Sequence, residues 1–249
     1  MNRPPDEIIL RVEGLTKAFG EIKALQGIDL TLRRGEFLTI FGPNGAGKTT
    51  LIKILSSLVK PTAGRFTINQ YTAREHGEAM RRLIGVISHR TFLYPQLTAY
   101  ENLAFYGEMY EISALDSRIM QLLGMVGLKH RAHDPVRTFS RGMQQRLSIA
   151  RALIHDPPLL FLDEPYTGLD PHASELLRDL LLRLHDQERS IILTTHNLSR
   201  GLEMCDRVAI QVAGRIVFSA PKSEIDLETF PQLYFHYASQ QSDEVRSDA

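Results

Sequence analysis

The residues with the clearest chemical content lie between 42 and 50, where the sequence reads GPNGAGKTT. This stretch matches the pattern G-x-x-x-x-G-K-[ST], in which backbone N–H groups turn toward a phosphate and the following helix adds partial positive charge. Lys48 would reach the β- and γ-phosphates of a nucleotide, and the Thr49 hydroxyl would be a ligand of Mg²⁺. An ordinary glycine-rich turn is the alternative, but the favoured interpretation is phosphate binding by Gly42, Pro43, Asn44, Gly45, Ala46, Gly47, Lys48, Thr49 and Thr50.

Two adjacent carboxylates end the apolar run LLFLDEP, residues 159–165. Asp163 would hold Mg²⁺, as a carboxylate does in nucleotide hydrolases with such a loop. Glu164 would be the general base that polarises the attacking water, a role typically worth ~10²–10⁴-fold in rate. Two acids at a strand end can also be solvated loop residues, but a complete phosphate loop elsewhere in the chain favours catalysis. The loop and the carboxylates together still leave kinases, GTPases and motor ATPases open.

The elements that would position these residues follow an α/β pattern. The run GEFLTIFG (35–42) predicts a strand directly before the loop, and KTTLIKILSSL has apolar residues at helical spacing after it. From about residue 90 to 155 the pattern is helical, and strands return beyond it. Further short β-type runs lie at 8–12, 27–32, 157–164, 190–196 and 207–220.

Composition and charge narrow the class of protein. The 249 residues are 43% hydrophobic, which suffices for a large core, and Lys+Arg and Asp+Glu both number 29. This balance gives no support for a protein that wraps nucleic acid. The single cysteine, Cys205, fits a reducing compartment. No run is long and apolar enough for a signal peptide or a membrane span, so a soluble, cytoplasmic chain is expected.

The stretch FSRGMQQRLSIARALIHDPPLLFLDEPYTGLD (139–170) resembles the signature motif, Walker B strand and D-loop of ATP-binding cassette (ABC) proteins. The resemblance extends over nearly the whole chain. It implies ATP and Mg²⁺ as cofactors and a P-loop α/β fold, with an antiparallel β-subdomain near the N-terminus and a helical subdomain at about 89–155. Residues 1–238 would form this nucleotide-binding domain, and 239–249 would be a polar, disordered tail.

The resemblance also assigns residues outside the phosphate loop. Ser140 and Gly142 match the signature, although Arg141 and Met143 depart from its usual Gly and Gln. Ser140 can cap the following helix, whose N-terminus would then face a γ-phosphate; a serine that is only a cap is the alternative. The family likeness further implies a D-loop at Gly168, Leu169 and Asp170, a switch histidine at His196 that contacts the γ-phosphate, and an adenine-stacking ring at Phe19.

His89 in GVISHR ends a predicted strand where the family usually has a glutamine that touches Mg²⁺ or its water. Imidazole is a poor ligand for Mg²⁺, which prefers oxygen. A neutral His89 that contacts the metal through water is therefore expected, and a strand-end histidine without a role is the alternative. This histidine and its neighbours resemble the ATP-binding subunit of the haem exporter of cytochrome c maturation, while multidrug and polysaccharide exporter subunits share the Ser-x-Gly-Met signature.

The function implied by the resemblance is ATP hydrolysis that drives a membrane transporter. One phosphate loop and one signature imply a homodimer or heterodimer of nucleotide-binding subunits in the ATP-bound state. Separate integral membrane subunits, no nucleic acid, and a peripheral place on the cytoplasmic face of the inner (plasma) membrane are also implied. A soluble cassette protein of DNA repair or translation is one alternative, although those carry two cassettes or a long coiled-coil insert. A regulatory module that does not hydrolyse ATP is the other, and Glu164 and His196 argue against it.

Overall fold

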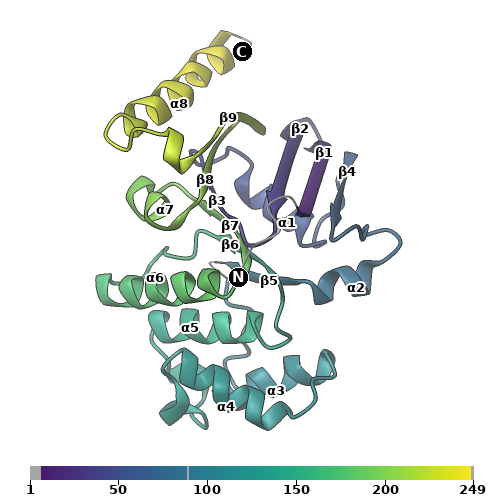
Figure 1. Ribbon diagram of the computed structural model, residues 1–249, viewed down its shortest axis with the longest axis vertical. Helices are drawn as coiled ribbons and strands as arrows, with labels where there is room; N and C mark the ends of the chain where they lie inside the picture. The colour runs from purple at the N-terminus through teal and green to yellow at the C-terminus, as the bar shows by residue number, and fades with distance from the viewer. Residues whose placement is uncertain (1–6, 89, 248–249) are drawn as a thin grey trace.

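The computed structural model describes residues 7–88 and 90–247, with side chains as far as Ser239. Its strands form two sheets (Figure 1). The smaller one has the order β2-β1-β4 and is antiparallel throughout. It is built from β1 (Ile8–Phe19), β2 (Ile22–Arg33) and β4 (Ala63–Ile68). The predicted antiparallel β-subdomain near the N-terminus is confirmed.

The larger sheet has the order β5-β6-β7-β3-β8-β9 and is parallel except at β9. Every residue of its three central strands β6, β7 and β3 is buried, because helices and the smaller sheet cover both faces. The carboxyl ends of parallel strands meet at one edge, the usual place for a ligand in such a sheet. The strands are β3 (Phe37–Phe41), β5 (Ile84–Ser88), β6 (Leu159–Asp163), β7 (Ser190–Thr195), β8 (Arg207–Val212) and β9 (Arg215–Pro221).

Three helices lie in the range 89–155 where a helical subdomain is expected, and they gather at the lower end of the molecule in Figure 1. They are α3 (Ala99–Met109), α4 (Leu115–Met125) and α5 (Arg141–Ala152). The remaining helices are α1 (Lys48–Leu55), α2 (Gly77–Arg82), α6 (Pro171–Asp186), α7 (Leu198–Met204) and α8 (Phe230–Ser247), with 3-10 turns at Lys129–Arg131, Val136–Thr138 and Lys222–Glu224.

Two hydrophobic cores lie on opposite faces of the larger sheet. Phe37 and Leu162 face a core shared with α5 and α6, whereas Leu38 and Phe161 face a core shared with α1 and the smaller sheet. Successive residues of a strand point to opposite faces, so each central strand contributes to both cores. The sheet that carries the functional residues is therefore held rigidly from both sides.

The structure differs from the sequence prediction at the C-terminus. Residues 239–249 are expected to be a disordered tail, but α8 extends as far as Ser247. The helix begins with Phe230 and Tyr234, which are buried in the core, so its first turns are anchored. The polar residues beyond 239 continue the same helix, and composition alone did not reveal this. Among the described residues, the structure contains no helix that is both long and apolar enough to cross a membrane.

Candidate nucleotide site

The loop at 42–47 connects β3 with α1 and wraps around a pocket of ≈ 270 Å³. Gly47 has φ 97°, and a Cβ there would lie 2.4 Å from the Ala24 carbonyl oxygen, so only glycine fits. Helix α1 follows with no side-chain cap and no acidic residue in its first turn. Its first N–H groups and its positive dipole end are therefore available to an anion in the pocket.

Lys48 lies inside this loop with only 6% of its surface exposed. Its Nζ donates hydrogen bonds to the carbonyls of Gly42 (2.6 Å) and Pro43 (3.1 Å) and lies 3.8 Å from Glu164 Oε1. Burial lowers the pKa of Lys48, and the nearby carboxylates of Glu164 and Asp163 oppose that effect. The structure thus holds a cation at the bottom of the pocket with carbonyls that a phosphate could replace.

Asp163 is buried at the carboxyl end of β6 and receives two hydroxyl donors. Its Oδ1 accepts from Thr49 Oγ1 at 3.0 Å and from Thr194 Oγ1 at 2.8 Å. Carboxylate and hydroxyl oxygens are the donors that Mg²⁺ prefers, and this ion usually takes one or two protein ligands together with substrate phosphates. No group of three or more His, Cys, Asp or Glu residues that could hold a metal occurs in the described part of the chain. The oxygens of Thr49 and Asp163 fit an ion that is completed by a nucleotide.

Glu164 follows directly, with a left-handed backbone (φ 49°) that turns its side chain to the pocket. Its N–H donates to the Thr194 carbonyl at 3.0 Å. Its Oε2 accepts from Thr195 Oγ1 at 3.2 Å, and its Oε1 lies 2.9 Å from His196 Nδ1. The left-handed conformation of a non-glycine residue costs on the order of 1 kcal/mol or more. The backbone and both carboxylate oxygens are thus held in place, and the carboxylate is able to accept a proton from a water molecule in the pocket.

The signature residues and Asp170 lie elsewhere. Ser140 caps α5 by accepting from Met143 N at 3.3 Å, as the sequence predicts. Asp170 caps α6 by accepting from Ala173 N at 2.8 Å. Gly142 packs against the same Ala173, where an added Cβ would come within 2.9 Å of the alanine Cβ. Within the described chain, these three predicted site residues are not part of the phosphate-loop pocket.

Two other predicted residues lie near the rim, and one cannot be placed. Phe19 ends β1 with half of its surface exposed, and Lys17 Nζ lies 4.8 Å from its ring centroid. It does not line the phosphate-loop pocket, whereas Ile22 of the same β1–β2 turn does. The His196 side chain is 58% exposed. His89 lies outside the described residues.

Three residues that support the site are missing from the sequence prediction. Thr194 and Thr195 hold the two carboxylates, as described above. Gln211 is buried in β8, and its Nε2 donates to the Ala46 carbonyl of the phosphate loop at 3.0 Å. A glutamine inside the apolar run RVAIQV was a visible signal, because a buried amide requires hydrogen-bond partners.

Comparison with known proteins gives consistent results. A family model described as ABC transporter matches residues 25–167. The fluoroquinolones export ATP-binding protein of Mycobacterium tuberculosis is 41% identical over 221 residues, which are 88% of this chain and 73% of that protein. The linearmycin resistance ATP-binding protein of Bacillus subtilis is 35% identical over 219 residues, 87% of this chain and 70% of the relative.

Solved structures agree with these relatives. A dimeric ATP-binding cassette in a post-hydrolysis state, bound to ADP and Pi, superposes with a TM-score of 0.77 at 29% identity, covering 86% of this chain and 98% of the other. The cbiO1 protein of Clostridium perfringens, part of an ABC transporter complex, superposes with a TM-score of 0.79 at 28% identity over 92% and 93% of the two chains. The chain belongs to the ABC transporter family, as one of its ATP-binding and ATP-hydrolysing subunits.

Proposed function

We propose that this subunit powers a bacterial exporter of the drug- or antibiotic-resistance kind. The observation that carries ATP hydrolysis is the position of Glu164, whose carboxylate is held by Thr195 and His196 at the mouth of the phosphate-loop pocket. The export direction and the type of cargo are supported by the names of the relatives. Besides the two described above, these include a daunorubicin resistance ATP-binding protein of Streptomyces coeruleorubidus, 36% identical over 88% of this chain and 70% of that protein.

The proposed chemistry assigns a role to each residue of the pocket. The Lys48 ammonium exchanges its two loop carbonyls for the β- and γ-phosphates. Thr49 and Asp163 would hold Mg²⁺, which neutralises phosphate charge when it is bound. The Glu164 carboxylate takes a proton from the attacking water. His196 holds Glu164 in the resting pocket and, being largely exposed, is free to contact the γ-phosphate.

The site is proposed to be completed by a second nucleotide-binding subunit, either another copy of this chain or a related one. Ser140 and Gly142 are not part of this chain's own pocket, and the helix they open has a capped N-terminus suited to a phosphate. The dimeric relative supports this arrangement. Separate integral membrane subunits would carry the cargo, and the dimer would bind to them as a peripheral protein on the cytoplasmic face of the membrane.

The narrower haem-export hypothesis depends on His89 and the residues around it. The relatives reported above are instead named for drug and antibiotic export or resistance, which favours the drug-type alternative. The two hypotheses differ in which compound accelerates ATP hydrolysis by the complete transporter.

The test is to purify the chain with its membrane subunits from detergent-solubilised membranes and reconstitute the complex in liposomes. ATP hydrolysis is then measured with a fluoroquinolone, with daunorubicin and with haem, using a complex that carries Glu164→Gln as the control. Stimulation by a drug but not by haem is expected. Stimulation by haem and by neither drug would contradict the proposal.

A further inference from the structure

The outer edge of the larger sheet is formed by β5, which pairs only with β6 in the described structure. Leu159 N on the β6 side donates to the Leu83 carbonyl at 3.2 Å. Carbonyls alternate in direction along a strand, so those of Ile84 and Val86 point away from β6, toward the edge. Edge carbonyls that are covered by protein need donors from another element.

Two side chains supply these donors. Arg151 Nη2 donates to the Val86 carbonyl at 2.6 Å, and His155 Nε2 lies 3.0 Å from the Ile84 carbonyl. Arg151 is in the last turn of α5, and His155 is in the turn that follows. The two donors, four residues apart in the chain, thus reach two carbonyls that are two residues apart on β5. We call Arg151 and His155 the edge clamp.

Aromatic rings of α3, of its C-cap residue Tyr110 and of Phe92 in the segment after β5 contact the edge clamp. The Arg151 guanidinium lies 5.2 Å from the Tyr106 ring centroid and 5.5 Å from that of Phe92. The His155 ring stacks on Tyr110 at 3.9 Å with an interplanar angle of 11°. Tyr106 and Tyr110 are also four residues apart, so two matched layers lie over β5. Aromatic faces stabilise a cation that has little water around it.

No carboxylate of the described residues is among the groups that act on Arg151, and its guanidinium instead faces the rings of Tyr106 and Phe92. Burial lowers the pKa of Arg151, and burial also lowers the pKa of His155 to about 4. Neutral His155 can donate its Nε2 hydrogen to the Ile84 carbonyl. Its Nδ1 and Arg151 Nε have no hydrogen-bond partner among the described residues. The half-buried Arg151 cation is thus held mainly by one carbonyl and two rings, and not by a carboxylate.

The two elements that the edge clamp joins both lead to proposed site residues. Strand β5 continues to Ser88, which is opposite Asp163 in the register with β6. Helix α5 begins directly after its N-cap residue, Ser140. We infer that Arg151 and His155 are positioning residues for ATP hydrolysis, which fix the Asp163 end of the sheet relative to the signature helix. This inference rests on the roles proposed above for Asp163 and Ser140.

The test compares kcat and KM for ATP hydrolysis in Arg151→Met and in a matched control, Arg146→Met. Arg146 lies on the same helix and also donates to a carbonyl, that of Val126 at 2.8 Å, but this contact is to the end of α4 and not to β5. We expect Arg151→Met to lower kcat by roughly 10- to 100-fold, the scale of a misplacement of about 1 Å. KM should be unchanged, because the phosphate loop is not touched. Arg151→Lys keeps a cation and should restore part of kcat.

His155→Phe gives an independent arm, because it keeps the ring stacked on Tyr110 and removes only the donor. It should lower kcat in the same direction, and thermal unfolding of each variant separates this effect from lost stability. Equal kcat in Arg151→Met and Arg146→Met, with an active wild type, would overturn the edge clamp alone. A loss confined to KM or to the melting temperature would also overturn it. A wild type that hydrolyses no ATP would overturn the proposed function and the edge clamp together.

Discussion

At the scale of single residues, the site depends on a few buried polar groups that satisfy one another. Lys48 is held by carbonyls of its own loop, and Asp163 by two threonine hydroxyls. Groups of this kind are costly to bury without partners. Each is therefore sensitive to a change that removes one hydrogen bond.

The lowered pKa of Lys48 predicts an alkaline loss of ATP affinity. Because burial favours the neutral amine, the ammonium loses its proton below the ordinary lysine value of 10.5. The attraction for phosphate is then present at neutral pH and is lost as pH rises through this lowered pKa. Calorimetry of ATP binding from neutral to alkaline pH measures the loss.

Lys48→Ala should bind ATP weakly and should show no further loss of affinity at alkaline pH. Lys23→Ala removes an exposed lysine of the same pocket and should still show that loss. Identical profiles in wild type and Lys48→Ala would contradict this assignment.

Thr194→Val tests the support of Asp163. The change keeps the shape of the side chain but removes the donor at 2.8 Å from Asp163 Oδ1. The free energy of unfolding should fall by roughly 1–3 kcal/mol, as expected for a buried acceptor that loses a partner. The Mg²⁺ concentration for half-maximal hydrolysis should also change, because the carboxylate is proposed to hold the metal. Thr39→Val removes a buried hydroxyl that donates to the Gly201 carbonyl and serves as the control. An equal change of the Mg²⁺ requirement in both variants would count against the metal role.

At the scale of elements, parallel strands bring the loop, the carboxylates and the threonines to one edge. In the pairing of neighbouring strands, Asp163 is opposite Thr194 and Phe41 is opposite Thr195. Helix caps then fix the surrounding segments, with Ser140 at α5 and Asp170 at α6.

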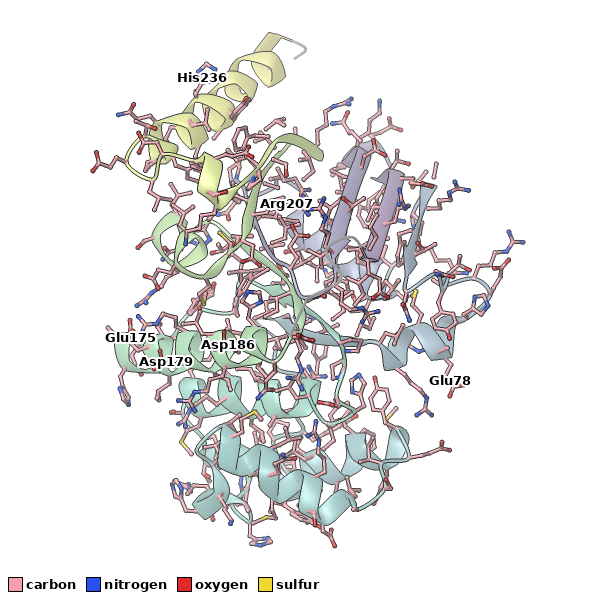
Figure 2. The ribbon with its side chains drawn as sticks, viewed as in Figure 1. Glu78, Glu175, Asp179, Asp186, Arg207 and His236 are labelled. Atoms are coloured by element: carbon pink, nitrogen blue, oxygen red, sulfur yellow. The ribbon has the colours of Figure 1, made fainter. Side chains whose placement is uncertain are left out.

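The acidic residues Glu175, Asp179 and Asp186 follow Asp170 along α6 (Figure 2). Of these, Glu175 pairs with Arg178 on its own helix and with Arg200 on α7.

Asp170 has a capping role that can be separated from its proposed place in the nucleotide site. Asp170→Ala should lower the free energy of unfolding by about 0.5–2 kcal/mol, because Ala173 N loses its acceptor. Asp170→Asn should retain that stability, since asparagine caps a helix about as well as aspartate. Urea denaturation of both variants is the measurement. The same loss in both would show that the carboxylate charge matters more than the cap.

The parts of the site that sequence patterns predicted are those encoded by neighbouring residues. The phosphate loop and the pair Asp163–Glu164 are local motifs, and the strand-loop-helix order around them follows from hydrophobic periodicity. Thr194, Thr195 and Gln211 were missed because their partners lie about 31 or 165 residues away and depend on strand order and register. The extension of α8 was missed because a polar stretch does not by itself distinguish a helix from a disordered tail.

At the scale of the whole molecule, the phosphate-loop pocket and the signature residues of one chain are separate, which predicts a site shared between two subunits. Ser140→Arg should abolish hydrolysis and leave ATP binding to the isolated monomer intact. Mixing this variant with Lys48→Ala should restore part of the activity, because one composite site in the mixed dimer then has two unmutated halves. Each variant alone is the control. Loss of monomer binding in Ser140→Arg, or no recovery on mixing, would contradict the shared site.

The most direct test of the account is the rate of ATP hydrolysis in Glu164→Gln. The carboxylate would be replaced by an amide of the same shape, so ATP affinity should be retained while turnover falls at least ~10²-fold. We also expect the ATP-bound dimer to persist in size-exclusion chromatography, on the hypothesis that hydrolysis releases the two subunits. Glu78→Gln, an exposed change on α2 (Figure 2) at a residue that does not line the pocket, is the charge-matched control and should keep the wild-type rate. A Glu164→Gln protein that hydrolyses ATP at nearly the wild-type rate would contradict the account.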